Sequence, residues 1–227
     1  TVKGSYFKQG AGGKGFNQGI AAHKAGGSVA MITKLGRDSM AQVATDAMDA
    51  VKLSKEHLFY SDEVSTGIAL IMVNEQTSQN EIVVVPGACG TITESDIQSV
   101  EKEICESGYI LLQLEVNQNA NEKVAAMAKA HGVRVIINTA PYQPMSDAFL
   151  QGAYLITPNE TEAEELTGIA VCDLESADRA ARVSFDKGVQ NGLITLGGKG
   201  VYLNVGGKSE IIPAYKVNAI DTTAAGD

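Results

Sequence analysis

The chain is poor in cysteine and in basic residues, and both shortages limit what it can be. Its 227 residues include three cysteines, an odd number without any C-x-x-C pair. We therefore expect neither a disulfide framework nor a zinc site. We expect a reducing, cytosolic setting. Lys and Arg number 18 against 27 Asp and Glu, giving a net charge of −9. Because the basic residues form no stripe, we expect no nucleic-acid partner and no anionic membrane surface.

Long apolar runs and a natural chain start are also missing. The longest apolar stretch, near 109–116, is far too short to span a bilayer, and we expect no signal peptide. The first residue is not methionine. Hydrophobic residues make up 44% of the chain, which is ample for one core. We expect one α/β domain over 1–227 that is incomplete at both ends.

Short apolar runs alternate with helical patterns along most of the chain. Strands of four to six residues separated by helices predict βαβ units, and hence a doubly wound, mostly parallel sheet flanked by helices. The expected strands are 28–36, 109–115, 133–138, 153–157 and 192–197. The expected helices are 39–51, 119–132, 161–168 and 175–188.

Three segments depart from this alternation. Residues 65–87 read strand, polar turn, strand, which predicts a hairpin. Residues 2–12 alternate polar with aromatic side chains and look like a strand. We expect these two segments, approximately 1–12 and 64–87, to form a small β lid. Residues 200–212 predict a second hairpin at the sheet edge.

The glycine-rich segment 10–27 allows two interpretations. Gly10, Gly12 and Gly15 satisfy G-x-G-x-x-G, and Asp38 follows at the distance of a dinucleotide ribose ligand. That fingerprint requires a buried strand directly before it, and the preceding residues are too polar for one. A dinucleotide-dependent oxidoreductase is therefore the weaker alternative.

The start of this helix offers a polar ligand site instead. Gly12 and Gly13 would let a ligand approach the backbone closely. Lys14 and Asn17 are three residues apart, so they face one side of the helix and could hold hydroxyl groups. The alternative is a plain turn with Asn17 facing solvent.

Acidic residues follow two of the expected strands. Asn159 and Glu162 lie at the carboxyl end of 153–157, where their oxygens could hold Mg²⁺ through water. A capped helix with a solvated face is the alternative. Glu115 ends the buried strand 109–115 at the mouth of the sheet, although it could simply cap the next helix. The letters GGKG recur at 197–200, where they close a hairpin.

The last residues, DTTAAGD, predict an anion site. Ala224, Ala225 and Gly226 would turn into a helix whose first amides point at the loop. Asp227, in the first turn, would then lie beside a bound anion. The alternative is an ordinary acidic residue at a helix start.

The order of these motifs resembles the ribokinase/PfkB family of carbohydrate kinases over essentially the whole chain. The two most specific segments are GGKGFNQ (12–18) and DTTAAGD (221–227). STGIA (65–69), PNETEAEELTG (158–168) and LITLGGKG (193–200) indicate the ribokinase branch of that family.

The resemblance implies roles for the last residues. Asp227 matches the catalytic base that takes the proton from the sugar's primary hydroxyl, and it also contacts the sugar. Ala224, Ala225 and Gly226 match the anion hole that steadies the transferring phosphoryl group.

The resemblance also implies ligand contacts elsewhere in the chain. The positions that match sugar contacts under the lid are Gly12, Gly13, Lys14, Asn17 and Glu115. The positions that match nucleotide contacts are Asn159, Thr195 and Gly197. Glu162 matches the residue that organises Mg²⁺ through water, and Asp221 and Thr223 match a loop that typically holds K⁺.

The function that the resemblance implies is ATP-dependent phosphorylation of D-ribose to ribose 5-phosphate. The ligands would be a small sugar and ATP, with Mg²⁺ as cofactor and K⁺ as activator, and two subunits could pair through their lids. One alternative is a kinase for another furanose, a deoxy sugar or a nucleoside. Another is a sugar-binding module without catalysis.

The chain departs from the family pattern in three places. It starts after the strand that contains the family's N-x-D sugar motif, and it stops before the helices that complete the adenine pocket. Residues 138–141 read NTAP, where a proline commonly follows the asparagine. We expect the 227 residues alone to be inactive and poorly stable.

Overall fold

The computed structural model describes residues 4–73, 80–217 and 226 of the chain. The chain divides into two compact units, Thr1–Thr91 and Ile92–Asp227, called here the first and the second unit. The single domain expected from the sequence stays a prediction. Within the described ranges, no helix combines the length and the apolar character that crossing a bilayer requires.

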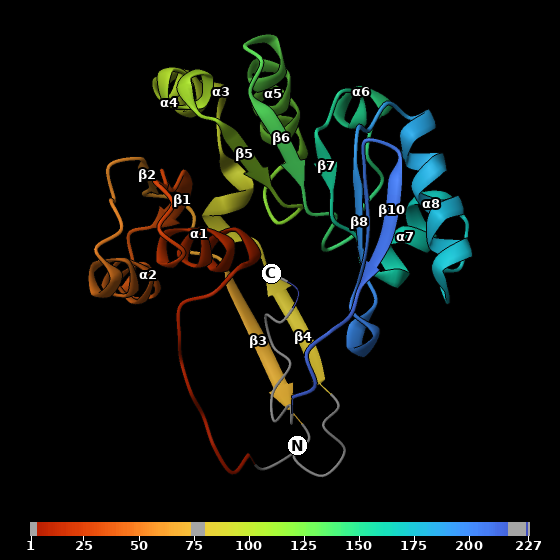
Figure 1. The fold of residues 1–227 in the computed structure, drawn as a ribbon. Coiled ribbons are helices and arrows are strands. Elements are labelled where there is room, and N and C mark those ends of the chain that lie inside the picture. Colours follow the sequence, from red (N-terminus) through yellow and green to blue (C-terminus); the bar gives the residue numbers. More distant parts are fainter. Residues whose placement is uncertain (1–3, 74–79, 218–225, 227) are drawn as a thin grey trace. The chain divides into compact units, whose positions relative to one another are not determined.

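The first unit is a βαβ arrangement with a hairpin attached (Figure 1). Its elements are α1 (Lys14–Lys24), β1 (Thr33–Gly36), α2 (Ser39–Val51), β2 (Leu58–Ser61), β3 (Ile68–Val73), β4 (Asn80–Val85) and the 3₁₀ turn η1 (Gly87–Thr91). Strands β1 and β2 pair in parallel, from Thr33 opposite Leu58 to Gly36 opposite Ser61. The parallel pairing follows from α2, which returns the chain to the same end of the sheet.

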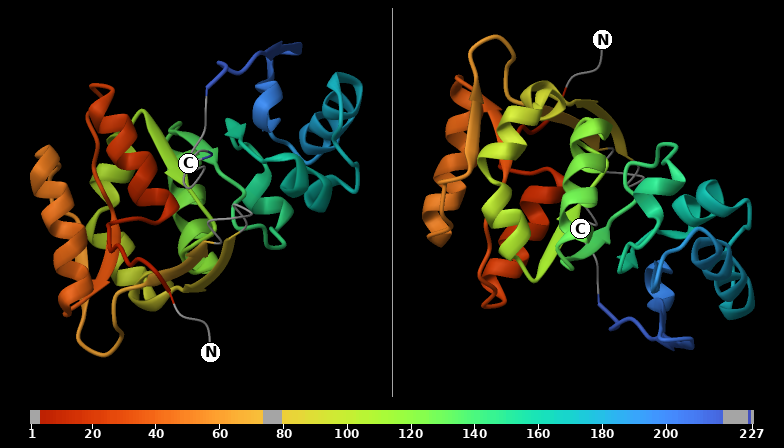
Figure 2. Two further views of the ribbon diagram at one scale, coloured as in Figure 1. Left: turned by 90° about the horizontal axis from the view of Figure 1, so that it is seen from below. Right: turned by 90° about the horizontal axis from the view of Figure 1, so that it is seen from above.

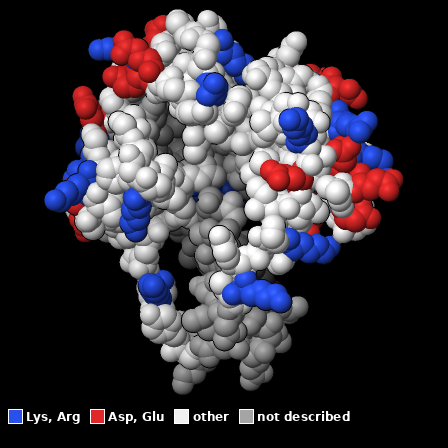
Figure 3. All heavy atoms as spheres, viewed as in Figure 1, with Lys and Arg blue, Asp and Glu red and all other residues white. Residues whose placement is uncertain are grey.

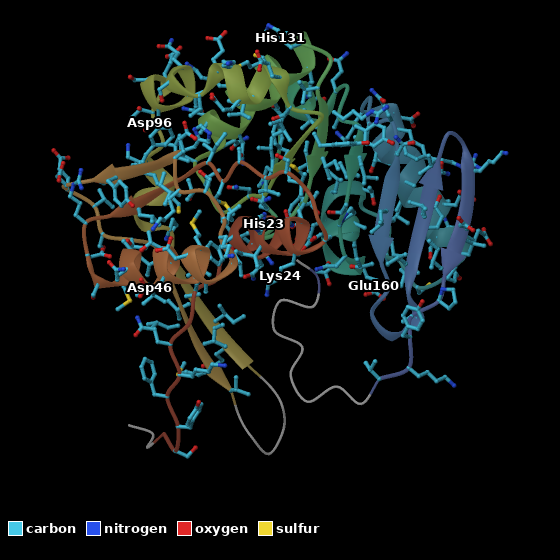
Figure 4. All side chains as sticks on the ribbon, turned by 60° about the vertical axis from the view of Figure 1, so that its left-hand side comes forward. His23, Lys24, Asp46, Asp96, His131 and Glu160 are labelled. Atoms are coloured by element: carbon cyan, nitrogen blue, oxygen red, sulfur yellow. The ribbon has the colours of Figure 1, made fainter. Side chains whose placement is uncertain are left out.

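Apolar side chains between these elements form the core of the first unit. Its buried members are Met31, Leu35, Ala41, Met48, Leu53 and Leu58. Helices α1 and α2 lie side by side in both views of Figure 2 and are in contact. His23 of α1 joins them, since its Nε2 lies 2.9 Å from the carbonyl oxygen of Val51 in α2 (Figure 4).

Of the two segments expected to form the lid, one contains the predicted strands, and the lid itself stays a prediction. Residues 65–87 do contain an antiparallel hairpin, with Ile68 opposite Val85 and Val73 opposite Asn80. The expected strand at 2–12 is wrong over its described part, because residues 4–12 form no strand. Tyr6 and Phe7 are 78% and 83% exposed. The alternation alone does not make a strand where no neighbouring strand completes the hydrogen-bond ladder.

The second unit is a six-stranded sheet with its helices. Its helices are α3 (Glu94–Ser99), α4 (Glu101–Glu106), α5 (Gln118–Ala130), α6 (Asp147–Leu150), α7 (Glu160–Thr167), α8 (Leu174–Asp186) and the 3₁₀ turn η2 (Gly197–Lys199). Its strands are β5 (Tyr109–Leu112), β6 (Arg134–Ile137), β7 (Leu155–Ile156), β8 (Gly192–Thr195), β9 (Val201–Val205) and β10 (Lys208–Ile212).

The strand order in this sheet is β10-β9-β8-β7-β6-β5. Strands β5 to β8 are parallel, and β9 and β10 add an antiparallel hairpin at one edge, as the sequence predicts for 200–212. Helix α8 packs against β8, β9 and β10 (Figure 1). The core there consists largely of small helix residues against the sheet: Ala163, Ala177, Ala180, Ala181, Ile194, Leu196 and Tyr202.

Two strands of this sheet are much shorter than expected. Strand β7 is Leu155–Ile156, where the sequence predicted 153–157. The buried strand predicted at 109–115 is shorter, because β5 ends at Leu112. It forms an edge of the six-stranded sheet, and Tyr109 and Leu111 are exposed.

On the face shown in Figure 3, the described Lys and Arg side chains are interspersed with Asp and Glu and form no stripe.

Candidate active site

The glycine-rich segment of the first unit opens helix α1 as predicted. Gly13 is the N-cap, with φ 95° and ψ 140°, a conformation that residues with a Cβ rarely adopt. No side chain caps this helix, and its first turn contains no acidic residue. No atom of residues 4–73 or 80–217 lies within 4 Å of the position that a Cβ on Gly12 would occupy. The backbone at this helix start is therefore accessible to a ligand.

Lys14 and Asn17 lie in the first turn of the same helix. The Asn17 amide donates to the Gly13 carbonyl (2.9 Å), which closes that turn. Both residues are half-buried. A cationic and a carboxamide side chain on one side of a helix start, next to accessible backbone, suit a ligand rich in hydroxyl groups.

The dinucleotide interpretation of this segment fails. No strand is present at residues 4–13, so the G-x-G-x-x-G match lacks the strand it needs. Asp38 caps helix α2 instead, with its Oδ1 accepting the Ala41 amide at 2.9 Å. Both oxygens of its carboxylate accept backbone N–H groups in the first unit.

In the second unit, Asn159 and Glu162 form a reciprocal capping box at the start of α7. The Asn159 Oδ1 accepts the Glu162 amide (2.8 Å), and the Glu162 Oε2 accepts the Asn159 amide (3.1 Å). In addition, the Asn159 Nδ2 donates to Glu162 Oε1 (2.8 Å). The capped helix that the sequence offered as the alternative is thus present. It does not exclude a ligand role, since these residues follow strand β7 at the carboxyl end of the sheet.

Thr139 completes this cluster, and sequence reasoning missed it. Its fully buried hydroxyl donates to Glu162 Oε2 at 3.0 Å. Thr139 follows β6 and Glu162 follows β7, and these parallel strands are neighbours. The signal was available in principle, because the carboxyl ends of neighbouring parallel strands meet at one edge.

The Glu162 carboxylate is therefore held by three donors from the protein while only 9% of the residue is exposed. Burial of a charged group is tolerated when hydrogen bonds compensate it. A carboxylate has about four lone-pair positions, so one position remains, on Oε1. That position fits a hydrogen bond from a metal-bound water and does not fit direct bidentate ligation.

No larger metal site is present among the described residues. Nowhere in 4–73 and 80–217 do three His, Cys, Asp or Glu side chains gather closely enough to hold a metal ion. The donor set at Asn159 and Glu162 alone suits a hydrated Mg²⁺, which keeps most of its waters and takes one or two carboxylates plus phosphate oxygens.

Thr195 and Gly197 lie beside this cluster. Thr195 ends β8 and forms an isolated parallel bridge with Asn159, and its amide donates to the Pro158 carbonyl at 3.0 Å. Gly197 begins the turn η2 with φ 53°. The three expected nucleotide contacts are thus gathered at the carboxyl ends of β7 and β8, and Figure 4 labels Glu160 where α7 begins there.

Glu115 lies at the same edge of the sheet but does not end a strand. Strand β5 stops at Leu112, and Glu115 is a half-buried residue of the turn that follows. Two bonds hold this turn: the Leu114 amide donates to the Ala140 carbonyl (3.1 Å), and the Asn121 Nδ2 donates to the Gln113 carbonyl (2.7 Å). Two-sided support of this kind fixes the loop that bears Glu115.

Most of the predicted catalytic segment lies outside the described residues. This applies to Asp221, Thr223, Ala224, Ala225 and Asp227. Gly226 lies in a turn and is exposed. The roles inferred for these residues stay predictions.

Comparison with known proteins gives a consistent result. The whole chain, residues 1–227, matches the pfkB family of carbohydrate kinases. It is 42% identical over 227 residues to the ribokinase of Haemophilus influenzae, covering 100% of this chain and 74% of that protein. It is 34% identical over 228 residues to the deoxyribokinase of Salmonella typhi, again covering 100% and 74%.

Among solved structures, that of Arabidopsis thaliana ribokinase complexed with ribose and ATP has a TM-score of 0.90 and 28% sequence identity. The match covers 100% of this chain and 74% of that one. These similarities confirm the ribokinase-like α/β fold predicted from the sequence, and they rule against an oxidoreductase and a sugar-binding module without catalysis. The chain belongs to the ribokinase/pfkB family of carbohydrate kinases and is an ATP-dependent sugar kinase.

Proposed function

We propose that this enzyme phosphorylates D-ribose and releases ribose 5-phosphate and ADP. The observation that supports this sugar most directly is the 42% identity to a ribokinase over the whole chain. The 34% identity to a deoxyribokinase makes 2-deoxy-D-ribose the second candidate substrate.

The first unit supplies sugar contacts in this proposal. Gly12 and Gly13 present backbone to the sugar, and Lys14 and Asn17 hydrogen-bond its hydroxyl groups. The positive φ of the N-cap Gly13 and the lack of a side-chain cap at the start of α1 support this role. Glu115 contributes a further hydroxyl contact. The lid, β3 and β4, covers the sugar and excludes water, which would otherwise accept the phosphate.

The chemical step uses the last residues of the chain. Asp227 accepts the proton from the sugar's 5-hydroxyl while that oxygen attacks the γ-phosphorus of ATP. The amides of Ala224, Ala225 and Gly226 hold the charge on the transferring phosphoryl group. Phosphoryl transfer depends mostly on positioning and on charge stabilisation, so a base and an anion hole are the parts it needs.

The nucleotide contacts are Asn159, Thr195 and Gly197. The capping box fixes Asn159, and an isolated bridge joins Asn159 to Thr195 at the end of β8. Glu162 would accept a hydrogen bond from a water of the Mg²⁺ that accompanies ATP, through the lone pair left on Oε1. Bound Mg²⁺ supplies neutralising charge to the phosphate oxygens. Asp221 and Thr223 form the loop for K⁺ as activator.

Two further parts of the proposal concern the molecule's surroundings. The apolar side chains of β3 are exposed, Leu70 by 55% and Met72 by 59%, which supports pairing of two lids in a homodimer. The absence of a cysteine framework supports a cytosolic location.

The test is a substrate panel on the full-length enzyme. ADP release is measured with D-ribose, 2-deoxy-D-ribose, D-fructose and adenosine, in KCl and in choline chloride. We expect the highest kcat/KM for ribose and a lower rate without K⁺. A preference for 2-deoxyribose would replace the proposed substrate by the second candidate.

The matched control is Asp227→Asn. Because a positioned base contributes about 10²–10⁴-fold, this variant should lose that factor in kcat while calorimetry still detects ribose binding. Near-normal turnover would remove Asp227 from the mechanism.

A further inference from the structure

The Asp38 carboxylate joins two elements of the first unit. Its Oδ1 accepts the Ala41 amide in the first turn of α2 (2.9 Å), and its Oδ2 accepts the Thr66 amide (2.7 Å). These two backbone bonds, with that from Thr66 the larger influence, lower the pKa of Asp38 below 3.8. The carboxylate is therefore ionised at neutral pH and bonded on both oxygens.

Thr66 is fixed from a second direction as well. Its hydroxyl oxygen accepts the Gly36 amide at 2.9 Å, at the end of β1. The residue is 9% exposed. Thr66 thus has its amide bonded to the N-terminus of α2 and its hydroxyl bonded to the core strand β1.

Residues 65–67 and 86–88, called here the lid root, are the two chain segments that enter and leave the hairpin. The Ala88 amide donates to the Ser65 carbonyl at 2.8 Å. Gly87 has φ 57°, and a Cβ there would lie 2.5 Å from the Gly67 amide nitrogen and the Ser65 carbonyl oxygen. A Cβ on Gly67 would collide with the Pro86 carbonyl oxygen. The two segments therefore touch backbone to backbone.

Beyond the lid root, the described part of the chain packs little against the hairpin. All six residues of β3 are exposed. A two-stranded sheet without a packed face is only marginally stable alone. Within one subunit, the direction of β3 and β4 is therefore set largely where they join the core, at the lid root.

We propose that Asp38 is a positioning residue of the kinase, which fixes the lid root to helix α2 and thereby sets how well the lid encloses the sugar. The inference rests on the proposed function in one respect, that β3 and β4 cover the sugar. It assigns to Asp38 no contact with either substrate.

The test separates two roles of the Asp38 carboxylate: its hydrogen bond to Thr66 in the lid root, and its N-cap on helix α2. Serine caps helices about as well as aspartate but has a single, shorter oxygen. Asp38→Ser should keep the bond to Ala41 and lose the bond to Thr66. The matched control is Asp173→Ser, since Asp173 caps α8 by the same kind of bond, to the Ser176 amide at 2.8 Å.

We expect Asp38→Ser to raise the KM for sugar about tenfold, with the KM for ATP unchanged within twofold, because a mispositioned lid weakens enclosure of the sugar alone. ADP release should also exceed sugar phosphate formed, since water reaches the γ-phosphate. Asp173→Ser should alter neither quantity. A folded Asp38→Ser variant with unchanged sugar KM and unchanged coupling would overturn the proposal.

Amide hydrogen exchange tests the same inference without activity. The Ala88 amide does not bond Asp38, so its exchange reports the lid root as a whole. We expect it to accelerate at least about tenfold in Asp38→Ser, with the Ala41 amide still protected. If Ala88 exchanges faster in Asp38→Ser but the unsubstituted enzyme phosphorylates no sugar, the proposed function is refuted, while the role of Asp38 in fixing the lid root stands. Unchanged exchange at Ala88 would refute that role of Asp38.

A second pair of variants covers the case in which Asp38→Ser does not fold. Thr66→Val removes the acceptor for the Gly36 amide, and Thr66→Ser keeps it. Thr66→Val should raise the KM for sugar, as Asp38→Ser does. Thr66→Ser should have a KM for sugar close to that of the unsubstituted enzyme. Equal sugar KM in these two variants would count against the lid root as the determinant.

Discussion

Two helix starts in this molecule use an acidic side chain in different ways. At α2, Asp38 is the N-cap itself, and its second oxygen bonds the Thr66 amide outside the helix. At α7, Asn159 is the N-cap, and Glu162 closes the capping box from inside the helix. The Thr139 hydroxyl, in the loop after the neighbouring strand β6, donates to Glu162 as well.

The difference concerns what each carboxylate can still do. Both oxygens of Asp38 face backbone donors that connect protein segments, so it acts on the position of the chain. Glu162 is nearly buried and keeps one lone pair for a water, so it can act on a ligand. An acid at a helix start is therefore not one kind of feature. Its role depends on which donors reach it from elsewhere in the fold.

Among the variants that test this comparison, Glu162→Gln should have the largest effect. The substitution keeps the shape, removes the charge and turns one oxygen into a donor that would face Asn159 or Thr139. We expect kcat/KM to fall about 10²–10³-fold, the range for loss of one electrostatic group in an active site. The Mg²⁺ concentration for half-maximal rate should rise. Steady-state kinetics against Mg²⁺ measures both.

Glu164→Gln is the control for Glu162→Gln. It makes the same change of charge on the same helix at an exposed position. Its kinetics should match the unsubstituted enzyme. A similar loss in both variants would show that the net charge of α7 matters and Glu162 does not.

Thr139→Val should have the next largest effect. It removes the hydroxyl that donates to Glu162 and leaves a buried carboxylate with one donor fewer. Loss of a buried hydrogen bond to a charged group costs about 1.5–3 kcal/mol, which urea unfolding would detect as a lower midpoint. We also expect a higher Mg²⁺ requirement, because the carboxylate is less well held.

Thr139→Ser distinguishes the hydroxyl from packing. Serine keeps the donor and loses one methyl group, which costs about 1 kcal/mol in a core. It should therefore restore the Mg²⁺ requirement even where stability stays below that of the unsubstituted protein. If serine and valine raise the Mg²⁺ requirement equally, the hydroxyl does not position Glu162.

Local signals explain which parts of this fold could be predicted. The helix at 39–51 matches α2 from end to end, because Asp38 precedes it and its apolar residues recur at helical spacing. Both hairpins were predicted correctly. Their different surroundings were not, since β3 is exposed along its length while Tyr202 of β9 is fully buried. Strand pairing within a hairpin is local, whereas burial depends on the whole chain.

The errors have the same cause. Residues 4–12 have the alternation of a strand, but no pairing with another strand makes them one. The bonds from Thr139 to Glu162 and from Thr66 to Asp38 join residues 23 and 28 positions apart. Thr66 lies outside the local sequence of Asp38, and Asp38 lies outside that of Thr66, so a local pattern cannot predict their hydrogen bond. The expected ligand positions were found through motif order, which cannot show the residues that hold them.

The smallest effect, and a direct test of the Asp38 side of the comparison, is a change in acid stability. The hydrogen bonds from Thr66 and Ala41 lower the pKa of Asp38 in the folded protein. A lowered carboxyl pKa contributes stability that is fully present above the unfolded value, 3.8, and is lost as pH falls through the folded value. Asp38→Asn, which cannot ionise but can still cap α2, lacks this contribution. The gap in melting temperature between the two proteins should therefore be constant above about pH 5 and should shrink below pH 3.8. Because the remaining carboxylates titrate in both proteins, the difference isolates Asp38. A gap that stays constant down to the acid transition would mean that the Thr66 amide does not stabilise the ionised carboxylate.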